Sequence, residues 1–415
     1  MLTAAIYFST QFIQIIIFIA GCYFFGISIF GWIKRNPKNR TLHSPQKRFA
    51  LIIAAHNEEL VISHVIDSLS RQNYPKKLYD IFVIADNCSD RTAEIAEKHG
   101  AIVYKRANNE ERGKGYALEW MFNKIYSHKN KYDVISVFDA DNLVSSNYLL
   151  EMNHLLCKGH KVVQGYIDSK NPFDSWITCS YSIAFWMSNR IFQLPRYYLG
   201  LSCGLCGTGF CIDLNVLKKI GWGATCLTED LEFTMKLSLC NLKVAWAHEA
   251  VVYDEKPLTL KQSWYQRKRW MQGHADCASR FLKPLFKKAF KDMDLVAFDC
   301  AVYLFQPIRF IFIGLITLMM WIQTVFPESP FYNIKYVFPI GVWFIFVILQ
   351  FLYGPLIIMA ERKFNIKVLL GFVIYPLYCL TWIPITIQGF MSKDNKNWSH
   401  TAHTREITIN ELEKA

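Results

Sequence analysis

Four long apolar segments lie at the two ends of this chain, and they limit its fold more than any other feature of the sequence. Residues 12–33 form the first, and residues 301–325, 337–360 and 369–390 form the others. An α-helix needs about 20 apolar residues to cross a bilayer, and each segment is long enough. The chain is 52% apolar and only 19% charged, which also favours membrane spans over an ordinary soluble enzyme.

Basic residues follow the first apolar segment directly, within residues 34–47. No positive charge precedes that segment and no small-residue cleavage site follows it, so we expect an anchor rather than a removable signal peptide. The positive-inside rule then places the next residues in the cytosol. The formal net charge of +12 fits a membrane surface or a phosphorylated substrate as partner, and we expect no nucleic acid.

The last apolar segment raises a problem of orientation. The connection 361–367 is basic and should be cytosolic, so a single crossing by residues 369–390 would put the basic tail outside, against the positive-inside rule. Pro376 and Pro384 interrupt this segment. We therefore expect a Pro-broken hairpin or an interfacial helix followed by a cytosolic tail, unless the rule fails here.

Between the apolar ends, short apolar runs alternate with helical patterns. We expect strands at residues 49–55, 81–85, 101–104 and 134–138, and helices at 58–71, 92–99 and 115–126. This order is typical of a mostly parallel, doubly wound α/β sheet of the Rossmann-like kind. Residues 176–194 and 260–286 mix aromatic with polar or basic residues, which predicts amphipathic helices on the bilayer or surface helices of a larger domain.

Two carboxylates follow the expected strand at 134–138, where Asp139 and Asp141 are separated by one residue. In an open α/β sheet, ligands bind outside the carboxyl ends of the strands. Paired acids there can hold Mg²⁺ or Mn²⁺, with water and substrate phosphates completing the coordination. Because Asp is also a common turn residue, this spacing alone leaves a metal site and an acidic turn equally open.

Several strand ends and turns carry polar residues that suit a nucleotide. Carboxylates can accept hydrogen bonds from a base or ribose, and a helix start favours phosphate, although an acid there is equally suited to a plain N-cap. Glycine lets the backbone approach a ligand closely, although most such turns are only turns. The candidates are Asn57, Glu58, Asp86, Asp90 and Lys114, whereas the flexible turn with Gly207 and Thr208 indicates little by itself.

Two later stretches suit the acceptor side of a transfer reaction. Glu229 and Asp230 open a helix, where acids either stabilise the positive helix end or act as a general base. Gln266, Arg269 and Trp270 lie in the basic amphipathic stretch. Tryptophan offers a flat face to a sugar and arginine binds phosphate with two hydrogen bonds, while the plain alternative is a membrane-facing surface.

In this order and spacing, the motifs resemble those of membrane-integrated family-2 glycosyltransferases, the group of cellulose, hyaluronan, chitin and poly-N-acetylglucosamine synthases. The resemblance covers residues 49–273 by motif and the flanking segments by layout. It implies a GT-A fold, a UDP-sugar donor of the UDP-GlcNAc or UDP-glucose class, Mg²⁺ or Mn²⁺ as cofactor, and inversion by a single in-line displacement.

The expected function is that of a processive inverting β-glycosyltransferase, a hexosyltransferase and polysaccharide synthase that elongates and exports a β-linked glycan. The alternatives are a single transfer to a lipid acceptor and a scaffold without chemistry. The expected partners are the UDP-sugar, a growing glycan or lipid acceptor and the bilayer. The resemblance also allows for a small accessory membrane subunit.

The resemblance also implies a role for each motif residue. It implies nucleotide-sugar contacts from Asn57, Glu58, Asp86, Asp90, Lys114 and Asp139. It implies a metal held directly by Asp141, with Asp139 beside it, and a catalytic base at Asp230 with Glu229 as its neighbour. It implies acceptor or diphosphate contacts from Gly207, Thr208, Gln266, Arg269 and Trp270.

The resulting plan has an anchor, a soluble domain and a membrane part, and it predicts a multi-pass cell-membrane protein with a cytosolic catalytic domain. The sequence departs from the family at His56, where many members have Tyr. The expected parts are a transmembrane anchor at 1–33, a basic juxtamembrane linker at 34–48, a GT-A domain at 49–256, amphipathic interfacial helices with the Q-x-x-R-W motif at 257–296, transmembrane helices at 297–390 and a polar tail at 391–415.

Overall fold

A computed structural model spans residues 1–415 and describes all of them except 34–39, 130, 225, 396–404 and 415. The start of the predicted basic linker and the middle of the predicted polar tail therefore lie outside the described residues. At the centre is one eight-stranded sheet in the order β3-β2-β1-β4-β7-β6-β8-β5. Its strands are β1 (Phe49–Ala55), β2 (Tyr79–Asp86), β3 (Ile102–Arg106), β4 (Val134–Asp139), β5 (Leu143–Val144), β6 (Val162–Ser169), β7 (Phe210–Asp213) and β8 (Val244–Asp254).

The first half of the sheet is parallel, as the alternation of strands and helices predicts. β1 pairs in parallel with β2 and β4, and β2 pairs in parallel with β3. Alternate residues of β1 belong to different apolar clusters, with Leu51 on one face of the sheet and Ile52 on the other. Both faces are therefore buried, which explains the continuous apolar runs. The helices joining these strands are α2 (Ile62–Ser70), α3 (Thr92–Lys98), α4 (Lys114–Tyr126) and α5 (Tyr148–Cys157).

The second half of the sheet is mixed, which the doubly wound expectation does not cover. β7 is antiparallel to both β4 and β6, β6 is parallel to β8, and β5 is antiparallel to β8. β7 follows Gly209, whose φ is +62° and whose missing Cβ would lie 2.8 Å from Val252 Cγ2. Only glycine lets the chain turn this close to β8. The later helices of this part are α8 (Leu214–Ile220) and α9 (Glu229–Leu239).

Helices form in both stretches that were expected to be amphipathic. The first is α6 (Trp176–Ser188), which continues through a π-helical turn (Asn189–Gln193) into α7 (Leu194–Tyr198). The second is one helix, α10 (Leu260–Lys291). Capping boxes at Ser175 and Thr259 fix where α6 and α10 begin, because each side chain satisfies an otherwise free amide of the first turn.

Four described helices are long and apolar enough to cross a membrane by length and composition. They are α1 (Leu2–Ile29, continued by a short 3₁₀ turn, Phe30–Trp32), α11 (Leu295–Val325), α12 (Ile340–Ala360) and α13 (Ile366–Met391). The remaining short helices are the 3₁₀ turns Lys76–Leu78 and Ile334–Tyr336 and the terminal α14 (Ile409–Lys414).

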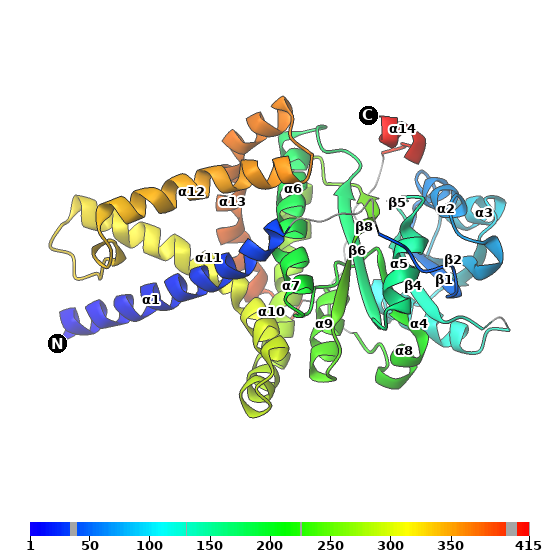
Figure 1. Ribbon diagram of the computed structural model, residues 1–415, viewed down its shortest axis with the longest axis horizontal. Coiled ribbons are helices and arrows are strands. Elements are labelled where there is room, and N and C mark those ends of the chain that lie inside the picture. Colours follow the sequence, from blue (N-terminus) through cyan, green and yellow to red (C-terminus); the bar gives the residue numbers. More distant parts are fainter. Residues whose placement is uncertain (34–39, 130, 225, 396–404, 415) are drawn as a thin grey trace.

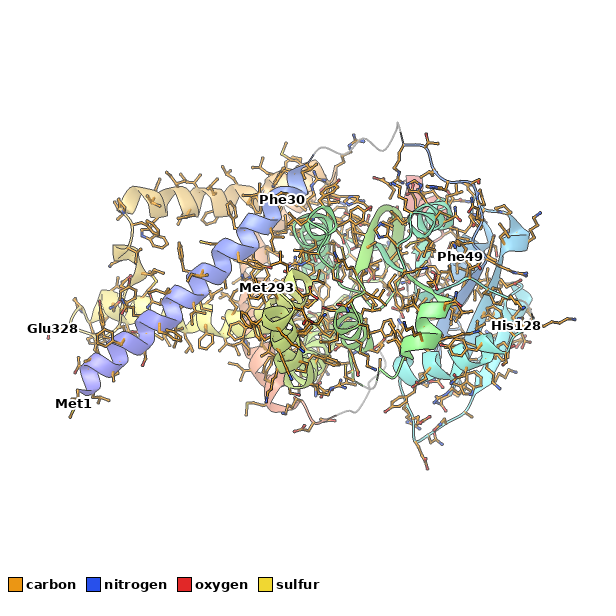
Figure 2. All side chains as sticks on the ribbon, turned by 60° about the horizontal axis from the view of Figure 1, so that its bottom comes forward. Met1, Phe30, Phe49, His128, Met293 and Glu328 are labelled. Atoms are coloured by element: carbon orange, nitrogen blue, oxygen red, sulfur yellow. The ribbon has the colours of Figure 1, made fainter. Side chains whose placement is uncertain are left out.

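Three of the long helices, α1, α11 and α12, extend away from the sheet in Figure 1. Figure 2 places Met1 and Glu328 together at the far end and Phe30 close to the soluble part. Near the middle of α1, Gln14 Nε2 donates to the carbonyl of Tyr332, in the loop between α11 and α12, at 2.6 Å. At the near end, Tyr23 of α1 donates to Asp299 of α11 at 2.9 Å. The chain of α1 is therefore antiparallel to that of α11 and is bonded both to the start of α11 and to the loop after its end.

Helix α13 is arranged differently, because it runs across the near ends of the other three in Figure 1. It packs on α6 through Gly371, where a Cβ would lie 2.5 Å from Cys179 Sγ, and on α10 through Gly389. Just before its start, Lys363 forms an ion pair with Asp168 of β6. Just after its end, the Ser392 carbonyl accepts from Gln272 of α10 at 2.9 Å. α13 is one continuous helix, so the hairpin alternative is wrong.

Candidate active site

The carboxyl ends of β2, β1 and β4 lie side by side, and they bring three of the predicted motifs to one edge. Ala54 of β1 pairs with Asp139 of β4, and Ala55 pairs with Ala85 of β2. Parallel strands in register end at the same edge of the sheet. The residues that follow β1, β2 and β4 therefore form a continuous polar rim.

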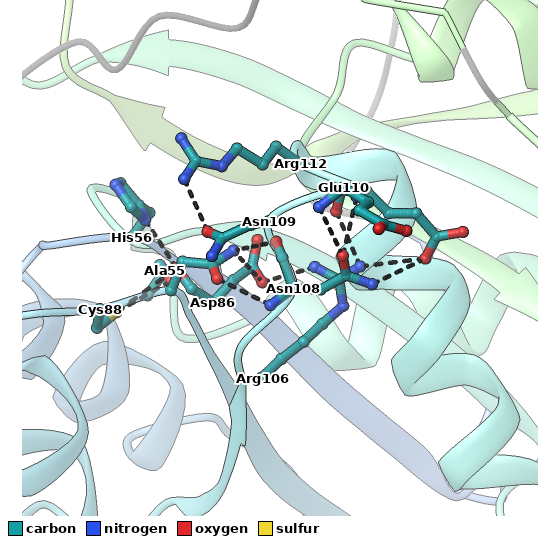
Figure 3. A network of polar contacts seen from close by, with 11 residues as sticks. Ala55, His56, Asp86, Cys88, Arg106, Asn108, Asn109, Glu110 and Arg112 are labelled. Atoms are coloured by element: carbon teal, nitrogen blue, oxygen red, sulfur yellow. Dashed lines mark hydrogen bonds and ion pairs between the residues drawn. The ribbon is translucent and has the colours of Figure 1, made fainter.

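Asp86, the last residue of β2, is the buried centre of one part of this rim. Its Oδ1 accepts from Arg106 Nη1 at 2.8 Å, and its main-chain carbonyl lies 2.7 Å from His56 Nδ1. Figure 3 shows this network, in which Arg112 extends from the neighbouring loop to Asn109. Arg106 ends β3 and was not among the predicted residues, although it stands at a strand end as Asp86 does.

Asp90 and the predicted pair Asn57 and Glu58 hold two loops together. Asp90 Oδ1 accepts from the Thr92 amide at 3.0 Å and from its hydroxyl at 2.6 Å, which ties Asp90 to the first residue of α3, although the N-cap position is Arg91. Partial burial alone would raise the pKa of Asp90, but the hydrogen bonds from Thr92 and from the Glu59 amide lower it. The Thr92 hydroxyl in turn accepts from the Glu58 amide at 2.8 Å, and Asn57 Oδ1 accepts from the Ser89 amide at 2.8 Å.

Lys114 lies at the centre of the second part of the rim. Its ammonium forms an ion pair with Asp139 and donates to the Gly207 carbonyl at 2.7 Å. Burial alone would lower the pKa of Lys114, but Asp139, Glu229 and Asp230 raise it above its usual value. This lysine is therefore a fixed cation among three carboxylates.

Glu229 and Asp230 begin α9 beside this cation. Loss of water contact, together with the charge of Asp230, raises the pKa of Glu229 to about 7. The same loss raises the pKa of Asp230, while the Leu231 amide, 2.8 Å away, and Lys114 oppose that change. A Cβ on Gly207 would lie 3.5 Å from Asp230 Oδ2, so the glycine turn borders this carboxylate.

Thr208 and Asn142 fix the main chain at the first acid of the Asp-x-Asp pair. The Asp139 amide donates to Asn142 Oδ1 at 3.0 Å and to Thr208 Oγ1 at 3.1 Å. The two acceptors also form a hydrogen bond with each other. The predicted Gly207-Thr208 turn is thus in direct contact with β4, and Asn142 is an addition to the predicted set.

Asp141 is buried and is held by residues that the sequence reasoning missed. Its Oδ2 accepts from the Glu255 amide at 2.9 Å, and its carbonyl accepts from Lys170 Nζ at 2.8 Å. Burial, opposed by the ion pair with Lys256 at 2.5 Å, raises the pKa of Asp254 to about 6, and the charges of Asp141 and Asp139 add to the rise. Asp254 is the last residue of β8, so the strand-end rule applied to Asp139 would have identified it.

The chemistry of this donor set fits a divalent cation. Burial is the main cause of the raised pKa of Asp254, and the charges of Asp141 and Asp139 add to it, so the three carboxylates are close neighbours. Among the residues that the structure describes, no three His, Cys, Asp or Glu side chains converge as metal ligands. A cation at Asp139 and Asp141 would therefore take its other ligands from water and substrate oxygens, as Mg²⁺ usually does.

The Q-x-x-R-W residues lie on α10, away from the carboxylates but connected to them. Gln266 Oε1 accepts from the Tyr181 hydroxyl at 3.0 Å, and Trp270 stacks on Trp382 of α13 at 6.5 Å between ring centroids. Arg269 is half-buried on the same helix. Gly273 of α10 connects this helix to the start of α9, because a Cβ on Gly273 would lie 2.4 Å from Oγ1 of Thr228, the residue before Glu229.

Comparison with known sequences gives one family and several relatives. Residues 45–273 match the family described as "Glycosyltransferase like family 2". The probable glycosyltransferase YdaM of Bacillus subtilis (strain 168) is 27% identical over 85% of this chain and 84% of its own length. The beta-monoglucosyldiacylglycerol synthase of Trichormus variabilis is 28% identical over 60% of this chain, which spans only 54% of that relative. The poly-beta-1,6-N-acetyl-D-glucosamine synthase of Staphylococcus epidermidis is 24% identical over 68% of this chain and 69% of its length.

Comparison with solved structures supports the fold. The mannosyltransferase PcManGT from Pyrobaculum calidifontis, solved with GDP-Man and Mn²⁺, has a TM-score of 0.58 at 14% sequence identity and covers 92% of this chain and 98% of its own. The part of the chain that contains the sheet is accordingly a GT-A-like domain. The matched residues 45–273 make up more than half of the chain, and the protein belongs to glycosyltransferase-like family 2 and is a glycosyltransferase.

Proposed function

We propose that this protein is an inverting, processive β-glycosyltransferase that moves hexose units from a UDP-sugar to the end of a growing glycan at the membrane. The observation that carries the proposal is the position of Lys114 between the donor edge, at Asp139, and the paired acids at the start of α9. The contact of Gly273 with Thr228 brings the acceptor motif of α10 to the same helix start.

In the proposed reaction, Asp86 and its loop hold the nucleotide, while Asp139 and Asp141 form the diphosphate end of the donor pocket. A bound Mg²⁺ or Mn²⁺ supplies charge stabilisation for the leaving diphosphate. Asp230 accepts the proton of the acceptor hydroxyl, which attacks the anomeric carbon as the bond to the diphosphate breaks. Arg269 adds positive charge on the diphosphate side, and Trp270 lies under the acceptor sugar.

A β-linked product is supported by two relatives whose names specify one, the glucosyldiacylglycerol synthase and the poly-N-acetylglucosamine synthase. One of these relatives is named for a polymer and the other for a glycolipid. The second candidate function is therefore a single transfer to a diacylglycerol-type lipid. The second candidate is favoured by the small number of helices available to line a glycan channel, since four described helices are long and apolar enough to cross a membrane. Polymer length therefore decides between them.

We further propose that the soluble domain faces the cytosol and that α13 lies along the inner leaflet rather than across the bilayer. The contacts at both of its ends, Lys363 with Asp168 and Ser392 with Gln272, are on the side of the catalytic domain. Its outward face is apolar, with Val373 exposed by 76% and Leu377 by 60%. Such a helix suits the lipid interface.

The test is product analysis with membranes that contain the full chain and radiolabelled UDP-GlcNAc or UDP-glucose. We expect a long polymer, whereas a product with one or two sugars would replace the main proposal with the second candidate. Asp230→Asn should lower turnover by at least about 10²-fold, the usual contribution of a general base, while UDP binding persists. Unchanged turnover would remove Asp230 from the role of base.

A further inference from the structure

The loop between α12 and α13 enters the catalytic domain at two buried polar sites. The Glu361 carboxylate, 3% exposed, accepts from the Tyr166 hydroxyl at 2.8 Å, forms an ion pair with Arg190 at 3.0 Å and lies 3.4 Å from His248 Nε2. Two residues later, Lys363 Nζ lies 2.6 Å from Asp168 Oδ2. The loop thus joins two membrane-side helices to the end of β6.

Asp168 depends on Lys363 for its positive partner. Its side chain is 4% exposed, and its Oδ1 accepts from Trp186 Nε1 at 2.6 Å and from the Ser169 amide at 2.8 Å. Lys363 is 35% exposed and Asp168 is buried, so removing the lysine leaves a buried carboxylate without its counter-charge. The end of β6 would therefore shift if Lys363 were neutralised.

The end of β6 leads directly to the Asp-x-Asp pair. Lys170, whose side chain is fully buried, donates to the Asp141 carbonyl at 2.8 Å and lies 3.9 Å from the Glu255 carboxylate. The Glu255 amide donates to Asp141 Oδ2 at 2.9 Å. Lys170 directly follows the end of β6, with only Ser169 between it and Asp168, so a displacement of Asp168 passes to Lys170 through the main chain.

We propose that the α12–α13 loop positions the donor side of the active site, with Lys363 acting through Asp168 and Lys170 on the main chain of Asp141. Lys363 is a positioning residue, since none of its contacts reaches the reacting groups. Measurements of sugar transfer test this proposal only if the proposed function is correct, whereas measurements of binding do not depend on it. Through this chain of contacts, the arrangement of the membrane helices sets the affinity of the donor pocket for its cation and nucleotide.

The experiment compares Lys363→Gln, Asp168→Asn and the double variant in the full-length, detergent-solubilised protein. The matched control is Arg362→Gln, which removes the same charge from the adjacent, exposed residue. Each single variant should raise the Mn²⁺ and UDP-sugar concentrations for half-maximal transfer by about tenfold, as loss of an outer support of a metal ligand does. The KM for the acceptor should not change, and the double variant should lie closer to the wild type than Lys363→Gln does, because it leaves no charge unpaired.

Calorimetric binding of UDP with Mn²⁺ gives a readout that does not need turnover. If the wild type transfers no sugar, the proposed function fails, while this measurement still tests the loop. If Lys363→Gln does not fold, Asp168→Asn keeps the shape of the side chain and carries the comparison. Binding and half-maximal concentrations that match those of the Arg362→Gln control, or effects that add in the double variant, would overturn the proposal.

Discussion

At the residue scale, the site depends on the balance between one lysine and three carboxylates. Lys114 contacts Asp139 directly and also lowers the pKa of Glu229 and of Asp230. Burial raises the pKa of both acids. At Glu229 this effect outweighs the effect of Lys114, and the pKa rises to about 7. A base beside a half-protonated acid is sensitive to small changes in pH.

This balance predicts an acid limb in the pH profile of sugar transfer. As the pH falls through about 7, Glu229 takes up a proton and the pair loses its full negative charge, so activity should fall. Glu229→Gln should abolish this limb, and Lys114→Gln should shift it to higher pH by removing the cation that lowers the pKa of Glu229. Profiles of kcat/KM from pH 5 to pH 9 check this; a limb that stays in place in both variants contradicts it.

The same pKa gives a linked prediction for stability. Glu229 binds its proton more tightly in the folded state, at about 7, than at its usual value of 4.5, so its contribution to folding is present below pH 4.5 and is lost as the pH rises through 7. Glu229→Gln should therefore have a higher melting temperature than the wild type at pH 8 and a similar one at pH 4. Thermal unfolding at the two pH values tests the sign.

The positions of site residues were predictable where a strand end made them visible, while their roles stay predictions. Asp86 and Asp139 end strands, and the parallel pairing of β1 with β2 and β4 places them on one rim as the sequence implies. Lys170 and Asn142 carry no such local signal, since their importance arises from contacts with Asp141 and Asp139 across the fold. A sequence pattern shows which residues are close along the chain. It does not show which main-chain groups form hydrogen bonds with a side chain that is distant in sequence.

At the element scale, the contact between α9 and α10 joins the predicted base to the acceptor motif. Gly273 lies against Thr228, and the gap between them has no room for a side chain. Gly273→Ala would bring a Cβ within 2.4 Å of Thr228 Oγ1. Overpacking of this kind costs about 1–3 kcal/mol, and here it would push the start of α9 out of place.

We therefore expect Gly273→Ala to lower both the melting temperature and the rate of transfer. Gly26→Ala in α1 is the matched control, because nothing lies within 4 Å of a Cβ there, and alanine is the better helix former. Thermal unfolding and initial rates of both variants in detergent check the expectation. A Gly273→Ala protein as active and as stable as the control would mean that α9 and α10 are not tightly coupled.

Element types were easier to predict than element boundaries and directions. The strands at 49–55 and 134–138 were expected almost to the residue because their apolar runs end in polar residues. The antiparallel direction of β7 and the π-helical turn after α6 depend on tertiary packing, with Gly209 against Val252 as one example. The local pattern of apolar residues predicts neither the direction of β7 nor the π-helical turn.

At the scale of the whole molecule, one buried ion pair joins the catalytic domain to the membrane helices. Arg196 of α7 binds Asp299 of α11 through Nε at 2.7 Å and Nη2 at 2.9 Å, and Tyr23 of α1 donates to the same carboxylate. Both charged side chains are at most 2% exposed. Three elements from distant parts of the sequence therefore meet at one charge.

Asp299→Asn should destabilise the molecule by about 3–5 kcal/mol, because it leaves the Arg196 guanidinium buried without a counter-charge. Replacing both partners by apolar residues, as in Arg196→Met with Asp299→Leu, should cost much less, since no charge is then left unpaired. Denaturant titration of the solubilised protein compares the two. Equal losses in both variants would show that the pair contributes through shape and not through charge.

The arrangement of the four long helices leads to the last prediction, which concerns the side of the membrane on which each end lies. By the positive-inside rule alone, a single crossing of the membrane by α13 would place the basic tail on the wrong side. In the structure both ends of α13 contact the catalytic domain, while the loop between α11 and α12 lies with the N-terminus at the far end. Reporter fusions test this: green fluorescent protein after residue 415 should fluoresce, and alkaline phosphatase there should be inactive.

A single cysteine at Glu328 should show the opposite behaviour, with rapid labelling by a membrane-impermeant maleimide in intact cells, because Figure 2 places that residue at the far end. A cysteine at Ser392 should be labelled only after the membrane is opened, because its carbonyl is bonded to α10 of the soluble domain. The exposed cysteines of the natural chain, Cys22 and Cys240, are first replaced by serine to remove background. Labelling of position 392 in intact cells would instead require α13 to cross the bilayer, and the contacts of Ser392 and Lys363 with one domain would then be wrong.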